Sequence, residues 1–169
     1  KVLLGEPRVL DVAVVKTRHE KWGETPVAFV ASSDPGLTAA DLLAEIAATG
    51  YEDFHQALDN GAAKEEAAVA KLQAMRRSYV TFAKAHPAVY KLMFGAETPP
   101  KSERLQRAMS AAWNQLTSAV TAAYGSDDAQ LRAVSTWSLV HGFAMLAINH
   151  RLPPALDQAR ALEMLTNRL

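Results

Sequence analysis

The sequence contains no cysteine, no long apolar run and no excess of charge of either sign. The absence of cysteine excludes disulfides, thiolate nucleophiles and cysteine-ligated metals. No uninterrupted apolar stretch reaches the roughly 18 residues expected of a membrane-spanning helix, so we expect no membrane partner. Lys and Arg number 18, as do Asp and Glu, so a polybasic surface for nucleic acid or anionic lipid is not indicated.

What the sequence does contain is enough apolar material for a folded domain. With 169 residues, the chain has room for one ordinary domain and an appendage. Hydrophobic residues make up 49% of it, which is typical of a globular protein, and the abundance of alanine favours helix over sheet. The apolar start of the chain is too short for a signal peptide, and we expect a cytoplasmic protein.

The first forty residues have the pattern of a β-hairpin. Val9–Val15 and Pro26–Ala31 alternate in the manner of strands, the polar stretch Thr17–Thr25 between them suits a loop, and Ser32–Gly36 is a strong turn signal. An isolated hairpin is marginal in water, so this one needs a partner surface. One structural hypothesis is that its exposed edges pair with a second hairpin across a dimer.

Everything after this segment has helical period. The pattern predicts helices over 38–60, 64–85, 88–94, 103–124, 128–150 and 155–169. Thr38 with Asp41 resembles a capping box, Asn60-Gly61 is a plausible stop, and Gly125-Ser126-Asp127 is expected to end one helix and cap the next. In helix 128–150 we expect an inward face made of Leu131, Val134, Trp137, Ser138, His141, Met145 and Ile148.

Several stretches of the helical part resemble one family of regulators. They are Trp137-x-x-x-His141-Gly142, Tyr79–Ala83 followed by His86–Phe94, and Asn149–Pro153. In this order they resemble the C-terminal domain of TetR/AcrR-type transcriptional regulators, over about residues 41–169. The resemblance implies a mainly α fold. It further implies that this helical bundle binds a small apolar or amphipathic effector in its interior. It also implies a homodimer through helices 128–150 and either 103–124 or 155–169.

The N-terminal segment resembles a different family. Gly5–Val15 and His19–Val30 are similar in run and spacing to part of the C-terminal domain of acyl-CoA synthetases, which are adenylate-forming enzymes. In that family a Gly-rich loop precedes this stretch and a catalytic lysine follows it in a Pro-x-x-Gly-Lys context. Here only Pro35-Gly36 is nearby and no lysine follows until Lys64, which favours an inert hairpin remnant over an enzyme.

The two resemblances meet near Thr38–Leu43. We therefore expect two units, a hairpin fragment over 1–40 and an effector-binding and dimerisation domain over 41–169. TetR-type regulators carry a helix-turn-helix unit in front of this domain, where a recognition helix reads DNA in the major groove. The hairpin stands in that place, so we expect no DNA-reading element in this chain.

Aromatic and sulfur-containing side chains at helical spacing are the candidates for an effector pocket. Such residues fill a core more often than they line a cavity, and both interpretations stay open for them. The same holds for His141, which either packs through a hydrogen bond or lines the pocket. The candidates are Tyr79, Phe82, Tyr90, Met93, Phe94, Trp113, Trp137, His141 and Met145.

Few residues suggest catalysis or metal binding. The five histidines include no pair at i, i+4 spacing, and Ser138 lacks the sharp turn of a nucleophile elbow, so we expect no catalytic site, metal or cofactor. Arg76-Arg77 and the pair Arg104 and Arg107 fit solvated helix faces. Gly142 is expected to let another helix of the bundle approach closely.

The predicted function is effector sensing and dimerisation, and the alternative is a non-catalytic acyl-CoA synthetase fragment fused to a helical domain.

Overall fold

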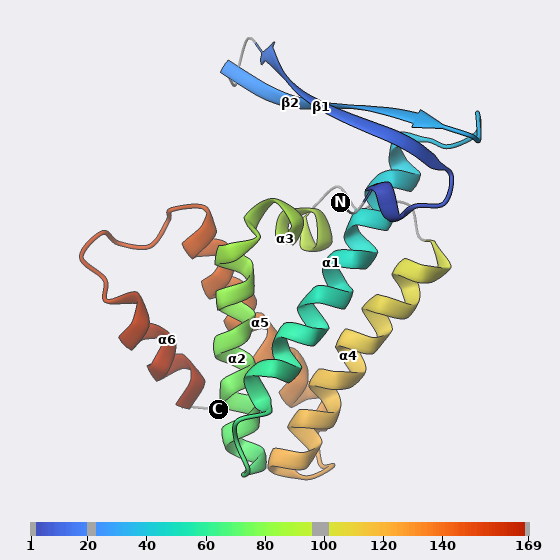
Figure 1. The fold of residues 1–169 in the computed structure, drawn as a ribbon. Coiled ribbons are helices and arrows are strands. Elements are labelled where there is room, and N and C mark those ends of the chain that lie inside the picture. The colour runs from blue at the N-terminus through green and yellow to red at the C-terminus, as the bar shows by residue number, and fades with distance from the viewer. Residues whose placement is uncertain (1–2, 20–22, 96–101, 168–169) are drawn as a thin grey trace.

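The computed structural model describes residues 3–19, 23–95 and 102–167, and it shows helices gathered in a bundle with a hairpin across one end (Figure 1). The mainly α fold with an N-terminal hairpin is therefore confirmed. The elements in chain order are η1 (Leu3–Gly5), β1 (Val9–His19), β2 (Gly23–Ser32), α1 (Ala39–Ala62), α2 (Ala68–Ala85), α3 (Pro87–Phe94), α4 (Glu103–Tyr124), α5 (Ala129–Ile148) and α6 (Gln158–Asn167).

The hairpin is longer than predicted. β1 and β2 pair antiparallel from Val9 opposite Ser32 to His19 opposite Gly23, so the stretch expected to be a loop is mostly strand. Polar side chains do not prevent this, because a ladder is held by backbone hydrogen bonds and a two-stranded ribbon leaves its side chains in water. Residues 3–38, as far as they are described, contain a turn and these strands, and no helix-turn-helix. Whether the segment forms a separate unit stays a prediction.

Helix α1 begins as predicted and ends later. The Thr38 hydroxyl accepts from the Asp41 N–H, and the Asp41 carboxylate accepts from the Thr38 N–H, which completes a capping box. Gly61 does not stop the helix. It lies inside α1, where an added Cβ would collide with the side chain of Ser78 on α2. The glycine therefore allows α1 and α2 to pack closely.

The other helix ends follow local chemistry. Pro87 occupies the first turn of α3, where its missing N–H costs nothing. The bounds of α4 are as predicted, with the Ser102 hydroxyl accepting from the Leu105 N–H and Gly125 following at a φ of 85°. The next helix is not capped by Ser126 or Asp127, because its N-cap residue is Asp128, which adopts a left-handed conformation without a side-chain cap.

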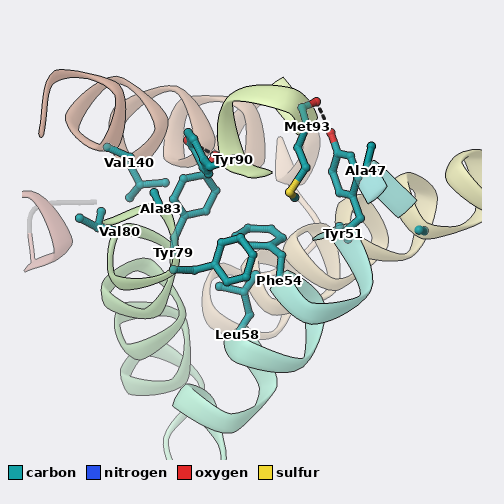
Figure 2. Close-up of a cluster of buried hydrophobic side chains, with 14 of the residues drawn as sticks. Ala47, Tyr51, Phe54, Leu58, Tyr79, Val80, Ala83, Tyr90, Met93 and Val140 are labelled. Carbon is teal, nitrogen blue, oxygen red and sulfur yellow. Dashed lines mark hydrogen bonds between the residues drawn. The ribbon is translucent and has the colours of Figure 1, made fainter. Parts of the chain in front are cut away.

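The core lies between α1, α2, α3, α4 and α5 (Figure 2). Phe54 of α1 meets the ring of Tyr79 edge-on at 5.0 Å and that of Phe82 at 5.3 Å, both from α2.

At the rim, Arg104 of α4 contacts the carboxylates of Glu45 and Glu52 on α1, each at 2.6 Å. Arg104 thus lies on a partly solvated face, with its side chain 40% exposed, and it also links two helices.

Helix α5 has two apolar faces, and the predicted inward face is only partly buried: Met145 and Ile148 pack against the core and Trp137 lines a cavity. The buried residues are Ala133, Thr136, Val140, Phe143 and Ala144. Leu131 and Val134, which were expected to point inward, are 66% and 45% exposed. Gly142 is also exposed, and a Cβ there would meet nothing within 4 Å, so its predicted role in packing within the bundle is wrong.

The double apolar character of α5 also gives it the composition of a membrane span. In the described part of the chain it is the one helix long and apolar enough to cross a bilayer, with a mean hydropathy of 1.3. Here it packs against α2, α4 and α6. Its apolar residues are thus divided between the bundle core and an outer surface.

Deleting residues 1–37 should leave the bundle intact. The described contacts of this segment with the bundle run mainly through η1 and α1, and the capping box of α1 lies outside the deletion. We expect the unfolding temperature, measured by circular dichroism, to change by no more than about 4 °C. A fall of more than about 10 °C would show that the hairpin is part of the folded core.

Candidate functional site

A cavity of about 210 Å³ lies between α1, α2, α4 and α5. Most of its lining is aliphatic or aromatic, and a few polar groups interrupt it, which is the composition of a small-molecule site. An apolar cavity of about 150 Å³ is large enough to hold benzene, so this one has room for a ring or a short acyl chain. The lining residues are Tyr51, Phe54, Leu58, Leu72, Met75, Arg76, Tyr79, Phe94, Met109, Ala112, Trp113, Leu116, Thr136, Trp137 and Val140.

Four of the predicted candidates line this cavity, namely Tyr79, Phe94, Trp113 and Trp137. Tyr90, Met93, His141 and Met145 are not part of its lining. Phe82 instead lines a second hollow between α1 and α2, where Lys64, Glu65 and Arg77 make the surroundings much more polar. The role of all these residues in ligand binding stays a prediction.

The hydroxyl of Tyr79 is the centre of a hydrogen-bond network beside the cavity. It accepts from the indole N–H of Trp137 at 3.1 Å and from the Tyr90 hydroxyl at 2.9 Å. The Nδ1 atom of His141 lies 3.1 Å from the Tyr79 oxygen and 2.8 Å from that of Tyr90. The donor in each of these two contacts depends on which ring nitrogen of His141 carries the proton.

Burial keeps this network uncharged. It raises the pKa of Tyr79 and that of Tyr90, so both hydroxyls retain their protons, and it lowers the pKa of His141. The lowered pKa favours the neutral imidazole, which has one donor and one acceptor nitrogen. Tyr90 and His141 therefore orient two residues of the cavity wall, Tyr79 and Trp137, without lining the cavity themselves.

Arg76 is the charged residue of the lining, and sequence reasoning missed it. Expected to be solvated, its side chain is only 2% exposed. Its Nη1 donates to the backbone carbonyl of Thr166 on α6 at 2.8 Å, and its Nη2 donates to the Thr136 hydroxyl on α5 at 3.2 Å. The signal was present in the sequence, because Leu72, Met75 and Tyr79 place Arg76 in the middle of an apolar stripe.

The rest of the lining comes largely from α1 and α4, whose apolar faces were predicted only as core. Tyr51, Phe54 and Leu58 recur at helical spacing, which cannot separate a filled core from a hollow one. Over the residues that the structure describes, no group of three or more His, Asp or Glu side chains comes together in a way that could hold a metal ion.

Comparison with known proteins shows that the chain is similar to a domain of transcriptional regulators. A family model of the tetracyclin repressor-like C-terminal domain matches residues 72–169. A protein of unknown function from Rhodococcus sp. RHA1 has a similar structure, with a TM-score of 0.67, 27% identity and coverage of 76% of this chain and 73% of its own. The proposed regulatory protein SCO4313 shares the fold, with a TM-score of 0.61, 20% identity and coverage of 75% and 71%. None of the curated proteins matches the chain. The resemblance of residues 2–43 to acyl-CoA synthetases receives no support.

The lowered pKa of His141 predicts that its environment makes the fold less stable in acid. In the unfolded state the His141 imidazole binds a proton near pH 6.5, whereas in the folded state it binds one only at lower pH. The free energy of unfolding therefore keeps its full value above pH 6.5 and decreases as the pH falls below 6.5. We expect the unfolding temperature to fall less between pH 7.5 and 5.5 in His141→Asn than in the wild type. All other ionisable groups are the same in the two proteins, so equal falls would contradict the assignment.

Proposed function

Because the chain belongs to the family of tetracyclin repressor-like C-terminal domains, we propose that it is the effector-sensing and dimerisation domain of a TetR-type transcriptional regulator. The observation that carries the proposal is the apolar cavity among α1, α2, α4 and α5. A filled core would be sufficient for stability alone, since protein interiors are close-packed. A hollow with aromatic walls and an ordered polar network beside it is what a ligand-binding domain requires.

The position of the cavity allows a bound effector to affect the outer surface of the bundle through α5. The buried side of α5 contributes Thr136, Trp137 and Val140 to the cavity wall, and the opposite side carries exposed apolar residues. An effector that fits one position of α5 better than another shifts the population between the two positions. The same movement displaces the outer face of α5, so binding is read out at whatever surface that face contacts.

Straight-chain alcohols should bind in the cavity with an affinity set by its size. We expect affinity to rise along the series from butan-1-ol to decan-1-ol by about 0.8 kcal/mol per methylene, until the space is full. Trp113 and Trp137 line the cavity and report binding through their fluorescence. Ala112→Leu, which fills the cavity, should abolish the response.

Ala111→Leu is the matched control, because Ala111 neighbours Ala112 on α4 but is exposed. It should bind the alcohols as the wild type does. An undiminished response in Ala112→Leu, or the absence of any saturable response across the series in the wild type, would contradict the proposal.

The outer face of α5 is proposed as the dimer interface. Leu131, Leu139 and Leu146 are exposed large apolar residues on this face, with Gly142 between them. Exposed apolar surface of this kind marks an interaction site, and a glycine without a neighbour in its own chain allows a partner helix to approach closely. The second helix of the interface is more consistent with α6 than with α4, because Met164 on α6 is exposed whereas α4 has no exposed large hydrophobic residue.

Placing a charge at position 142 should separate the subunits without unfolding them. In Gly142→Arg the new side chain points into open space in one chain, but in a dimer it would be buried without a counter-ion. We expect dimerisation, measured by sedimentation equilibrium, to weaken by at least about 100-fold, with an unchanged circular dichroism spectrum. Thr81→Arg, on the exposed side of α2, should dimerise normally. A wild type that stays monomeric, or a variant that still dimerises, would argue against this interface.

The proposal describes a binding protein rather than an enzyme, and it implies a cytoplasmic location, where a regulator meets its DNA. The hairpin has no assigned part in it. The idea that it derives from an acyl-CoA synthetase stays a prediction without support, and no observation on β1 or β2 favours a catalytic role.

A further inference from the structure

We propose that the effector is an amphipathic anion, a carboxylate with an apolar tail, and that Arg76 is the residue that binds its charged group. The inference rests on the proposed function of the cavity and specifies its ligand. It is carried by one unusual feature, a guanidinium group inside an otherwise largely apolar wall.

Within the part of the chain that the structure describes, Arg76 carries its charge without an acidic partner. Arginine stays protonated in proteins, and a buried charge is costly unless it is paired. Among the described residues no Asp or Glu forms an ion pair with it, although seven other ion pairs are present there. Burial lowers the pKa of Arg76, and the opposing effects come from the charge of Tyr124 and a side-chain hydrogen bond with it, so no carboxylate contributes to them.

The hydrogen bonds of Arg76 leave part of the guanidinium unused. Nη1 and Nη2 donate to a backbone carbonyl and a hydroxyl, both of which are neutral acceptors. The buried Nε has no acceptor. Guanidinium groups bind carboxylates through two parallel N–H donors, and Nε with a neighbouring Nη is one such pair. Because Arg76 lines the cavity, an anion there would compensate its charge.

The remaining walls select the other end of the ligand. Phe54, Leu72, Met109, Trp113 and Leu116 present carbon surface to the cavity, and no second cation lines it among the described residues. One charged end and one apolar body are therefore recognised, which excludes polyanions such as nucleotides. A volume of about 210 Å³ suits a monocarboxylate with a short chain or a single ring.

Arg76 also has a structural role that must be separated from recognition. Its bond to the Thr166 carbonyl caps the last turn of α6, where carbonyl groups lack helical partners and carry partial negative charge. Replacing Arg76 therefore affects stability whether or not a ligand binds. The test must compare ligands within each protein, so that a change in folding cancels.

The experiment measures the affinities of octanoate and octanamide by calorimetry at pH 7.5. The two probes have similar shapes but differ in charge. The proteins are the 169-residue wild type, Arg76→Gln, Arg76→Lys and the control Arg77→Gln. Arg77 is the adjacent residue, but its side chain is 46% exposed and lies near Glu65.

We expect the wild type and Arg77→Gln to bind octanoate at least about tenfold more tightly than octanamide, as hydrogen bonds to a charged group imply. The ratio of octanoate affinity to octanamide affinity should fall to about one in Arg76→Gln. In Arg76→Lys it should lie between the ratio of Arg76→Gln and that of the wild type. Equal binding of both probes by the wild type, or a ratio that survives in Arg76→Gln, would overturn the inference while the cavity remained a ligand site. Failure of the wild type to bind octanoate, octanamide or the alcohols would overturn the proposed function as well.

A second measurement needs only the wild type and so does not depend on a variant that folds. Octanoate labelled with ¹³C at its carboxyl carbon is titrated with acid while bound. Next to Arg76 the carboxylate should stay ionised to a lower pH than in free octanoate. A bound carboxyl that protonates at the same or a higher pH would exclude contact with Arg76.

Discussion

The buried guanidinium of Arg76 is the constraint on which much of the bundle depends. Its bonds to Thr136 and Thr166 connect α2 to α5 and α6. Because breaking these bonds would leave the buried cation with fewer acceptors, they favour one arrangement of the surrounding helices. The cavity is bordered by this cation, and its geometry and its chemistry are therefore set by the same residue.

Helix α2 organises both polar elements of the site. Arg76 and Tyr79 are three residues apart and lie on the same face, so the cation and the hydroxyl network stand side by side along one wall. The network links α2 to Tyr90 on α3 and to Trp137 and His141 on α5. A ligand in the cavity thus contacts a wall whose side chains are held from three helices. The outer, apolar face of α5 lies directly behind that wall.

The sequence was sufficient for the elements whose signals are local. Thr38 with Asp41, Pro87, and Ser102 with Gly125 define helix ends through their own backbone chemistry, and those ends were predicted to within a residue or two. The hairpin was recognised, but its length was not, because backbone pairing continued through polar residues.

The rest depends on tertiary contacts that a single sequence does not specify. Periodicity could not decide which of two apolar faces of α5 is buried, so Leu131 and Gly142 were placed inside. Arg76 was assigned to solvent by its charge, although its neighbours in the stripe argued for burial. A cavity is the absence of atoms between helices, and helical spacing alone predicts Phe54 and Trp113 equally well in a filled core.

A crystal structure of the 169-residue protein grown with octanoate tests the central claim most directly. The account predicts octanoate inside the bundle, with its carboxylate oxygens about 2.8 Å from the Arg76 guanidinium nitrogens and its chain along Phe54 and Trp113. A cavity closed by its own side chains, or octanoate bound only at the surface, would contradict it.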